Sequence, residues 1–280
     1  MQETVTSMST SFSSKTVIVT GGAGGLGFAI VQAFLAAGAN VVATDIQDTL
    51  LDALPAAVEA EHKERLLPYK CDSSDDAGVQ KLVSDTVARF GRLDILVNNA
   101  GILDKLLPLA ECTRHVWDSN LLVNLTGPFV TSQNAVRQYL SQELVNGHRG
   151  TILNVISTAG NHGGRAGVAY TASKHGLVGL TKSTAAFYGP KGIRSVGIMP
   201  GAMPTNISGG SHDFSQLHPE GKALSGATCQ TWQGEPGKGG WNLGISPLEQ
   251  VAKTVLVLCS DGMNTINGAL VPTDMGWAAV

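Results

Sequence analysis

Residues 16–27 read TVIVTGGAGGLG, a short β-branched run that stops at five glycines within seven positions. The apolar residues of 26–37 then recur at spacings of three and four, which predicts a helix that Gly38 ends. A strand, a glycine turn and a helix in this order let the backbone approach a pyrophosphate at the helix N-terminus. The alternative is a turn whose glycines only let the helix pack closely on the sheet. The candidate cofactor-binding residues of this turn are Gly21, Gly24, Gly25, Leu26 and Gly27.

Short apolar runs and helical patterns alternate along the rest of the chain. Continuous apolar strands that alternate with helices are typical of a parallel sheet covered on both faces. The last helix opens with a capping box, Ser246 to Glu249, and has Pro247 at its first helical position. We therefore predict an α/β fold built on a doubly wound parallel sheet. Strands are predicted at 41–44, 66–69, 93–97, 151–156, 193–199 and 269–271, and helices at 79–90, 115–141, 170–187 and 247–259.

The pattern predicts one catalytic domain over residues 15–280, preceded by a flexible tail of residues 1–14. One region, about 206–245, holds nine glycines and little periodicity. A loop of this length in a compact domain is usually a lid or a disordered segment. We predict a substrate lid inserted into the single domain.

The composition excludes several classes of protein. The chain has 19 basic and 22 acidic residues and no Lys/Arg cluster, which argues against a nucleic-acid or anionic-membrane surface. Its four cysteines are far apart, and neither they nor the histidines have metal-ligand spacing, so no disulfide and no metal site are expected. No apolar run reaches the roughly 18 residues of a membrane span. These features predict a protein of a reducing compartment, the cytoplasm.

An acidic residue follows the second predicted strand. Asp45 lies eighteen positions after Gly27, where a carboxylate accepts hydrogen bonds from the adenosine ribose hydroxyls. A carboxylate there would repel the 2′-phosphate of NADP, the glycine turn contains no Arg or Lys, and Gln47 follows the acid. NAD(H) is the predicted cofactor. The alternative is a solvated acid at the end of a strand.

A second candidate site is Tyr170-Thr171-Ala172-Ser173-Lys174. Positions i and i+4 of a helix share a face, so Tyr170 and Lys174 point the same way. A cation beside a phenol favours the phenolate, which brings the tyrosine nearer the pH at which it can exchange a proton with an alcohol or a carbonyl. Ser157, thirteen residues earlier at the end of a predicted strand, could hold the substrate oxygen. The alternatives are a surface Tyr–Lys pair and a serine that only caps the next turn.

Seven motifs now stand in order along the chain. They are TGGAGGLG at 20–27, Asp72, Asn98-Asn99-Ala100-Gly101, Asn124, Ser157, Tyr170-Thr171-Ala172-Ser173-Lys174 and Pro200-Gly201. In this order the chain resembles the short-chain dehydrogenase/reductase family, in its subgroup of about 250 residues, from about residue 15 to 276. The resemblance implies a Rossmann-type fold and redox chemistry on a small-molecule carbonyl or alcohol.

The resemblance also implies a role for each matching residue. Tyr170 would be the catalytic acid and base, Ser157 would orient the substrate oxygen, and Lys174 would bind the nicotinamide ribose and lower the tyrosine pKa. Asn124 would hold a water in a proton relay through the lysine. The helices near 115–141 and 170–187 would pair subunits into a homodimer or homotetramer. Further cofactor contacts are implied for Asp72 on the adenine, Asn98 on the adenosine side, and Met203 and Thr205 at the nicotinamide end.

Two departures from the family pattern bear on substrate shape and leave the four catalytic residues intact: Met275 in the closing segment and Pro204 after Pro200-Gly201. Three hypotheses remain at this point. The favoured one is an NAD(H)-dependent oxidoreductase that interconverts a secondary alcohol and a ketone. The others are an enzyme that uses the same cofactor for epimerisation, dehydration or ring formation, and a non-catalytic dinucleotide-binding module. Ser157, Tyr170 and Lys174 together argue against the module, because a protein that only binds a dinucleotide has no need of all three.

The predicted lid bears on the class of substrate. Its charged residues nearly cancel and include no Arg, although an Arg fork or a cationic cluster usually holds a carboxylate or phosphate. Arg165, in the turn after Ser157, is the nearby exception. The lid instead offers apolar groups that could close over a ligand, and we expect an uncharged, mainly apolar and cyclic substrate. The alternative is that these groups only pack the lid on the domain; they are Phe214, Leu217, Leu224, Trp232, Trp241 and Leu243.

Overall fold

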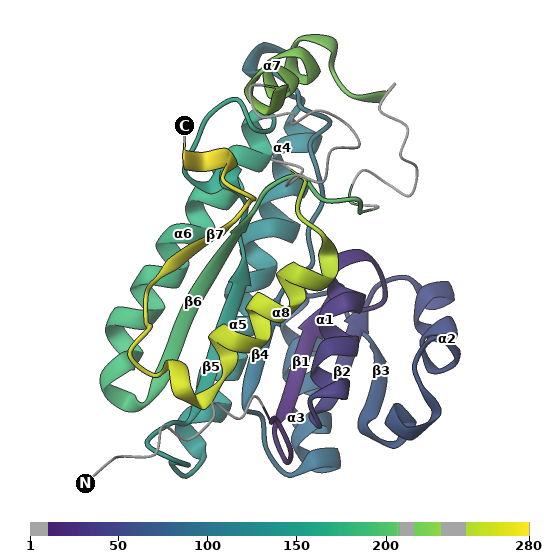
Figure 1. The fold of residues 1–280 in the computed structure, drawn as a ribbon, viewed down its shortest axis with the longest axis vertical. Helices are drawn as coiled ribbons and strands as arrows, with labels where there is room; N and C mark the ends of the chain where they lie inside the picture. The colour runs from purple at the N-terminus through teal and green to yellow at the C-terminus, as the bar shows by residue number, and fades with distance from the viewer. Residues whose placement is uncertain (1–10, 206, 208–215, 231–244, 280) are drawn as a thin grey trace, which may run out of the picture.

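The computed structural model of this chain describes residues 11–205, 207, 216–230 and 245–279. Within them, seven strands form one parallel sheet in the order β3-β2-β1-β4-β5-β6-β7 (Figure 1). The predicted α/β fold with a doubly wound, Rossmann-type parallel sheet in a single domain is confirmed. The strands are β1 Thr16–Thr20, β2 Asn40–Asp45, β3 Leu66–Lys70, β4 Ile95–Asn98, β5 Gly150–Val155, β6 Ile193–Pro200 and β7 Leu270–Thr273.

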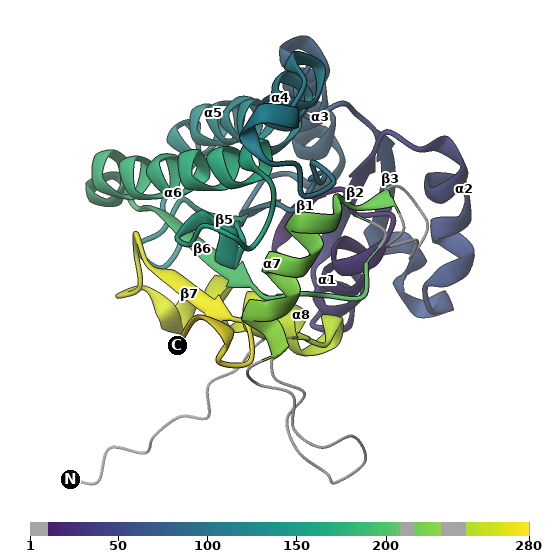
Figure 2. The same ribbon diagram turned by 90° about the horizontal axis from the view of Figure 1, so that it is seen from above.

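Helices cover both faces of the sheet (Figures 1 and 2). Side chains of β1 alternate between two cores, because successive residues of a strand point to opposite faces. Val17 and Val19 pack with residues of α1 and α8, whereas Ile18 packs with residues of α3 and α5. The helices are α1 Gly25–Ala36, α2 Asp48–Ala57, α3 Asp76–Phe90, α4 Arg114–Leu121, α5 Gly127–Ser141, α6 Val168–Tyr188, α7 Pro219–Gln230 and α8 Leu248–Cys259.

The strand order changes direction at β1. This strand pairs in parallel with β2 on one side and with β4 on the other. The chain runs outward from β1 to β3 and then crosses back to β4. In open α/β sheets, ligands bind beyond the carboxyl ends of the strands at such a reversal. The fold therefore places a candidate site beyond the carboxyl ends of β1 and β4.

The helix predicted at 115–141 is divided. It consists of α4, a π-helical turn over Leu122–Thr126, and α5. A π-helical turn inserts an extra residue into the helical hydrogen-bond ladder and is frequent at functional sites. Asn124 lies in this turn. The apolar spacing along the sequence does not show the interruption, since residues on both sides of it keep a helical period.

The predicted capping box at the start of α8 is wrong. The helix begins at Leu248, and no side-chain hydrogen bond caps its start at Pro247. The Ser246 hydroxyl instead donates to the Thr273 carbonyl at 2.6 Å, which links the start of α8 to the end of β7. Ser246 therefore makes its hydrogen bond to Thr273 of β7, and not to the first turn of α8 as the sequence pattern predicts.

Both outer strands of the described sheet contain a proline. Pro68 lies in β3 and Pro272 lies in β7. Proline has no N–H to donate to a strand ladder, so within sheets it is found mainly on edge strands. The edge position explains how residues 66–70 form a strand although Pro68 weakened the sequence signal for it.

The domain begins before the predicted boundary at residue 15. Phe12 is 3% exposed, and its ring meets that of Phe34 edge-on at 5.0 Å between centroids. Its backbone N–H donates to the Ala37 carbonyl at 2.8 Å. The predicted tail of residues 1–14 thus includes a residue of the core.

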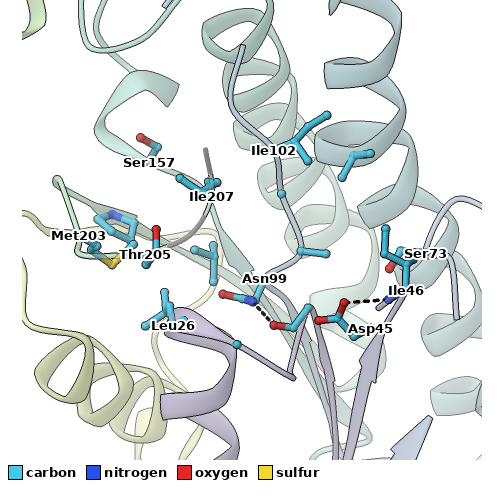
Figure 3. A pocket seen from close by; sticks show the side chains of 18 of the residues that line it. Leu26, Asp45, Ile46, Ser73, Asn99, Ile102, Ser157, Met203, Thr205 and Ile207 are labelled. Carbon is cyan, nitrogen blue, oxygen red and sulfur yellow. Dashed lines mark hydrogen bonds between the residues drawn. The ribbon is translucent and has the colours of Figure 1, made fainter. Parts of the chain in front are cut away.

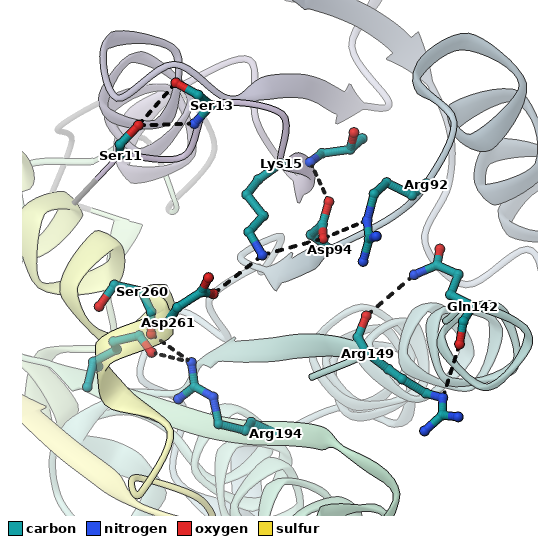
Figure 4. A network of polar contacts seen from close by, with 12 residues as sticks. Ser11, Ser13, Lys15, Arg92, Asp94, Gln142, Arg149, Arg194, Ser260 and Asp261 are labelled. Carbon is teal, nitrogen blue, oxygen red and sulfur yellow. Dashed lines mark hydrogen bonds and ion pairs between the residues drawn. The ribbon is translucent and has the colours of Figure 1, made fainter. Parts of the chain in front are cut away.

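A polar network lies at the amino-terminal edge of the sheet (Figure 4). The buried Asp94 carboxylate accepts hydrogen bonds from the Thr16 backbone N–H at 2.9 Å and from Arg92 Nε at 2.8 Å. Arg194 donates to carbonyls at and beyond the end of α8, including that of Leu258 at 3.0 Å. These contacts fasten the edge of the sheet opposite the candidate site.

Part of the predicted lid is helical. Helix α7 lies within residues 206–245 and stands above α4 (Figure 1). Phe214, Trp232, Trp241 and Leu243, which the lid hypothesis also used, lie outside the described residues. None of the helices in the described part of the chain combines the length and apolar character that crossing a bilayer requires.

Candidate active site

A cavity of about 350 Å³ opens beyond the carboxyl ends of the strands (Figure 3). The glycine turn, the segments that follow β2, β3, β4, β5 and β6, and helix α6 all contribute to its wall. The structure therefore brings together residues that are far apart in the sequence. The predicted site residues that line it are Gly21, Gly24, Gly25, Leu26, Asp45, Asp72, Ser157, Tyr170, Lys174, Met203 and Thr205.

The glycine turn owes its shape to backbone conformations that favour glycine. Gly21 and Gly25 have φ angles of +60° and +51°, in the left-handed region that L side chains rarely adopt. A Cβ at Gly27 would overlap the Gly21 carbonyl oxygen, so Gly27 serves the close packing of helix on turn and does not line the cavity. At Gly24 a Cβ would have only Leu50 near it, at 3.7 Å.

These features fit a pyrophosphate. No side chain caps the start of α1 at Gly24, and the first turn of a helix carries N–H groups without intrahelical partners. Gly24, Gly25 and Leu26 all line the cavity at that point. The bare backbone leaves space for a phosphate, and the helix N-terminus favours its negative charge.

Two acids lie at the end of the cavity next to β2 and β3. The Asp45 carboxylate accepts hydrogen bonds from the backbone N–H of Ile46 at 2.9 Å and of Gln47 at 3.1 Å. Asp72 accepts from the Ser74 hydroxyl at 2.7 Å and from the Ser74 N–H at 2.9 Å. Both carboxylates are thus held in place at the cavity wall. Among the lining residues that the structure describes, Lys174 is the only cation.

Asn98 does not lie where a contact with the adenosine side of the cofactor was predicted. Its side chain donates to Asn154 Oδ1 at 2.8 Å and to Ser132 Oγ at 3.0 Å, and accepts from the Thr131 hydroxyl at 2.6 Å. It is buried between the sheet and α5 and does not line the cavity. The next residue, Asn99, does line it and donates to the Thr20 carbonyl at 2.9 Å (Figure 3). Asn99 therefore takes the cavity position that was predicted for Asn98.

Ser157, Tyr170 and Lys174 meet on one side of the cavity. Ser157 follows β5, and its hydroxyl accepts from the Ala159 N–H at 3.1 Å. Tyr170 lies in the first turn of α6, and Lys174 lies one turn later, with Nζ 5.4 Å from the Tyr170 ring centroid. Lys174 Nζ donates to the Val155 carbonyl at 2.9 Å. A hydroxyl, a phenol and a buried ammonium thus converge from two elements.

Burial shifts both titratable groups toward their neutral forms. It raises the pKa of Tyr170 to about 12, and a hydrogen bond from Ser157 acts in the opposite direction. Burial also lowers the pKa of Lys174 to about 8. The predicted lowering of the tyrosine pKa by the lysine is therefore not found here. Desolvation of the phenolate has the largest effect on the Tyr170 pKa, because a charged oxygen loses more from burial than a neutral phenol does.

Asn124 lies behind the cavity wall. Its Oδ1 accepts from the Ile102 N–H at 2.9 Å, and its Nδ2 donates to the Ile102 carbonyl at 2.9 Å and to Ser173 Oγ at 3.2 Å. A Cβ added to Gly101 would be 3.2 Å from Asn124 Oδ1 and 3.8 Å from Lys174 Nζ. Asn124 is therefore adjacent to the lysine, although it fixes the loop after β4 and does not line the cavity.

The sequence pattern missed residues on the loop after β4. Ile102 lines the cavity, and Asp104 binds the N-terminus of the helix that carries Tyr170. The sequence did indicate Asn99, because it belongs to the Asn-Asn-Ala-Gly motif at residues 98–101. For Asp104 the partners are more than sixty residues away, and no local spacing indicates them.

A sequence model described as short chain dehydrogenase matches residues 15–215, more than half of the chain. This chain belongs to the short-chain dehydrogenase/reductase family. A short chain dehydrogenase/reductase of Colletotrichum higginsianum, dpchG, is 42% identical over 280 residues, which is 97% of each chain. The 3beta-hydroxysteroid dehydrogenase 2 of Eggerthella lenta is 39% identical over 265 residues and covers 95% of each chain. The crystal structure of levodione reductase superposes with a TM-score of 0.82 at 32% identity, over 96% of this chain and 99% of that one.

Membership confirms the resemblance that the seven motifs indicated. The family is one of oxidoreductases that bind a nicotinamide dinucleotide and act on small molecules. The cavity of this chain has the glycine turn and the Ser–Tyr–Lys group at positions suited to those two tasks.

Proposed function

We propose that this short-chain dehydrogenase/reductase interconverts a secondary alcohol and a ketone with NAD(H), and that Tyr170 is its general acid and base. One observation carries the proposal. Ser157, Tyr170 and Lys174 line one side of a cavity that also reaches the glycine turn and Asp45. A site that only bound a dinucleotide would have no need of the serine and the tyrosine. The relative from Eggerthella lenta, a 3beta-hydroxysteroid dehydrogenase, is named for a substrate with a secondary hydroxyl group.

In the direction of alcohol oxidation, the substrate hydroxyl gives its proton to the Tyr170 oxygen. In the direction of reduction, the Tyr170 phenol returns a proton to the carbonyl oxygen. The nicotinamide cofactor, when bound, accepts or supplies the hydride. Ser157 donates a hydrogen bond to the same substrate oxygen and so holds it beside the phenol. Lys174 uses one of its three N–H donors at Val155 and offers the others to a ribose hydroxyl.

The charges of the cavity support an uncharged substrate. Its charged lining residues are Asp45, Asp72 and Lys174, and both carboxylates lie away from Ser157 at the β2–β3 end. Arg165, the one arginine of the turn after Ser157, is stacked on the Trp277 ring at 4.1 Å and donates to the Trp277 carbonyl at 3.2 Å. The wall near Ser157 includes apolar side chains of Ile102, Ile156, Met203 and Ile207. An apolar, cyclic alcohol or ketone suits this wall best.

The proposal extends to assembly and compartment. Large apolar side chains are exposed on α5 and α6, with Phe129 at 48%, Leu140 at 42% and Phe187 at 73%. Exposed apolar groups on adjacent helices favour association, which supports a homodimer or homotetramer. The free thiols of Cys71, Cys112 and Cys259 support the cytoplasm.

Tyr170→Phe is the direct test of the mechanism. We expect turnover to fall by about a hundredfold or more, the scale of general acid–base catalysis, with dinucleotide binding largely intact. Lys174→Ala should lower turnover and also weaken dinucleotide binding, because the lysine is assigned both to the nicotinamide ribose and to Tyr170. Tyr188→Phe, at the other end of α6 and outside the cavity, is the control. Turnover is followed by the absorbance of the reduced nicotinamide and binding by its fluorescence. An active Tyr170→Phe protein would favour the epimerase-type or binding-module alternatives.

The pH dependence should differ between the two directions. With a Tyr170 pKa raised to about 12, the phenol is protonated at neutral pH, so reduction should be flat from about pH 6 until Lys174, with its pKa lowered to about 8, begins to lose its proton. Oxidation needs the phenolate and should rise with pH over the same range. Ser157→Ala removes a hydrogen bond that lowers this pKa, so its oxidation profile should move to higher pH, whereas Thr158→Ala should leave the profile in place. The measurement is kcat against pH in each direction. A Ser157→Ala oxidation profile that keeps its position on the pH axis, or that moves to lower pH, contradicts the expectation.

Cofactor preference tests Asp45. NAD(H) should support turnover better than NADP(H), and Asp45→Ala combined with Gln47→Arg should narrow or reverse the preference by replacing a repelling charge with an attracting one. Asp48→Ala, three residues along on the surface and outside the cavity, is the matched control. The measurement is kcat/KM with each dinucleotide. A tenfold preference of the unmodified protein for NADP(H), about 1.4 kcal/mol, would make the assignment of Asp45 wrong.

The substrate class is tested by competition within one assay. Cyclic apolar ketones should give higher kcat/KM values than sugar alcohols or short acyl thioesters, because the described wall near Ser157 is apolar and contains no cationic cluster among its described residues. Specificity constants are compared at one pH and one cofactor concentration. A clear preference for polyols or thioesters would overturn the apolar-substrate proposal while leaving the redox proposal intact.

A further inference from the structure

Helix α6 begins two residues before Tyr170, and its start is held from outside the helix. The first N–H groups of a helix have no intrahelical partners and need other acceptors. The N-cap residue here is Gly167, which has no side chain to supply one. Tyr170 follows three positions later, so the position of its side chain depends on how this first turn is held.

Asp104, on the loop after β4, supplies the missing acceptors. Its Oδ1 accepts from the Gly167 N–H at 3.1 Å, and its Oδ2 accepts from the Tyr170 N–H at 2.9 Å. Between these two, the Val168 N–H donates to the Leu107 carbonyl at 3.0 Å. Asp104 is 1% exposed, and a Cβ at Gly167 would overlap its carboxylate. Glycine at the start of α6 is therefore what allows the carboxylate to reach the helix.

The loop that carries Asp104 is strained. Lys105 and Leu106 have φ angles of +56° and +61°, a left-handed conformation that residues other than glycine rarely adopt. Such a conformation persists only where the surroundings hold it. Asp104 Oδ1 accepts from the Leu106 N–H at 3.1 Å, which holds it from one side.

Helix α7 holds the same loop from the other side. The His218 N–H, just before α7, donates to the Lys105 carbonyl at 2.9 Å, and His218 Nε2 lies 3.0 Å from a carboxylate oxygen of Glu111. Gly221 lies so close to the loop that a Cβ there would overlap the Leu106 carbonyl oxygen. The loop over residues 104–107 is thus clamped between the first turn of α6 and helix α7.

We propose that Asp104 is a positioning residue for Tyr170, and that helix α7 acts on the tyrosine through the loop of residues 104–107. Asp104 does not line the cavity, so it determines the position of the phenol through the turn that carries Tyr170. The placement of α7, within the segment assigned to the substrate lid, then affects the distance between the phenol and the Ser157 hydroxyl. The expected effect on turnover rests on the proposed function, whereas the positioning of Tyr170 by Asp104 does not depend on it.

The charge of Asp104 gives the role a second signature. It raises the pKa of Tyr170, in addition to the larger effect of burial. Lys174, on α6 itself, is the cation near the phenol, and the Cys112 thiol faces Asp104. Removing the negative charge should therefore move the oxidation pH profile toward lower pH, opposite in sign to Ser157→Ala. A merely structural contact would weaken the fold and leave this profile unmoved.

Asp104→Asn is the first test, with Asp94→Asn as the matched control. Both acids are buried and accept backbone N–H groups, but Asp94 lies at the opposite edge of the sheet (Figure 4). We expect Asp104→Asn to lower kcat by about tenfold to a hundredfold, the scale of a misplaced catalytic group, with an unchanged dinucleotide Kd. Asp94→Asn should lower the melting temperature without changing kcat or the pH profile of the folded protein. Equal kcat values for the two variants would overturn the proposal.

A second pair of variants tests the connection to α7. Gly221→Ala places a methyl group against the loop, whereas a methyl group at Gly226, on the same helix, meets no atom of the described residues within 4 Å. Both replacements favour the helix to the same degree, so they differ only in this contact. Gly221→Ala should lower kcat severalfold, and Gly226→Ala should leave it unchanged. Equal activities would mean that α7 does not act on Tyr170.

A readout without turnover separates this inference from the proposed function. Protein labelled with ¹⁵N-tyrosine carries four labelled amides, and the Tyr170 signal is identified by its loss in Tyr170→Phe. We expect Asp104→Asn and Gly221→Ala to displace this signal, and Asp94→Asn and Gly226→Ala to leave it in place. If the protein turns over no alcohol or ketone, the proposed function fails and the amide signal alone decides on Asp104. A Tyr170 signal that stays in place in both test variants overturns the inference.

Discussion

The parallel pairing of β1 with both β2 and β4 determines where chemistry can occur in this chain. Parallel strands all end at the same edge of the sheet, so the segments after β1, β2, β3, β4, β5 and β6 must meet there. Because the chain leaves β1 and β4 toward opposite sides, the connecting helices diverge and leave the cavity between them. Residues as distant as Gly21 and Tyr170 become neighbours of one cavity for this reason alone. At the opposite edge the described residues leave a much smaller cavity, of about 20 Å³, and Asp94 and Arg194 fasten that edge with buried hydrogen bonds.

At Tyr170 and Lys174, burial in the cavity wall opposes the charged form of each side chain. Burial keeps water from most of both side chains, and each therefore favours its neutral form. The same exclusion strengthens every dipole and charge that remains, since the local dielectric is low. A single hydroxyl, that of Ser157, can then have a measurable influence on the phenol. Catalytic groups in such a place depend on precise hydrogen bonding more than those at an exposed surface do.

The parts of the site that sequence reasoning found are those encoded within one element. The glycine turn, the i and i+4 spacing of Tyr170 and Lys174, and Asp45 at the end of β2 all depend on neighbours a few residues away. Asn98 was predicted to contact the cofactor, although the alternation of side chains along β4 indicates that it faces the core. Leu96 belongs to the core beneath α3 and α5, so Asn98, two positions on, faces the same helices.

Other features depend on partners that no local pattern specifies. The Ser246 hydroxyl binds a strand 27 residues away instead of capping its own helix, and Asp104 binds a helix more than sixty residues away. The π-helical turn at Asn124 is likewise hidden, because apolar residues on both sides keep a helical period. In each case a tertiary hydrogen bond or packing contact prevails over the local preference.

The prolines of the outer strands have a consequence for the behaviour of the protein at high concentration. An exposed strand edge is a template on which a second chain can add, and proline interrupts that template because it has no N–H to share. With Pro68 at one border of the sheet and Pro272 at the other, neither border offers an unbroken ladder. Strand-to-strand polymerisation is therefore disfavoured at both borders.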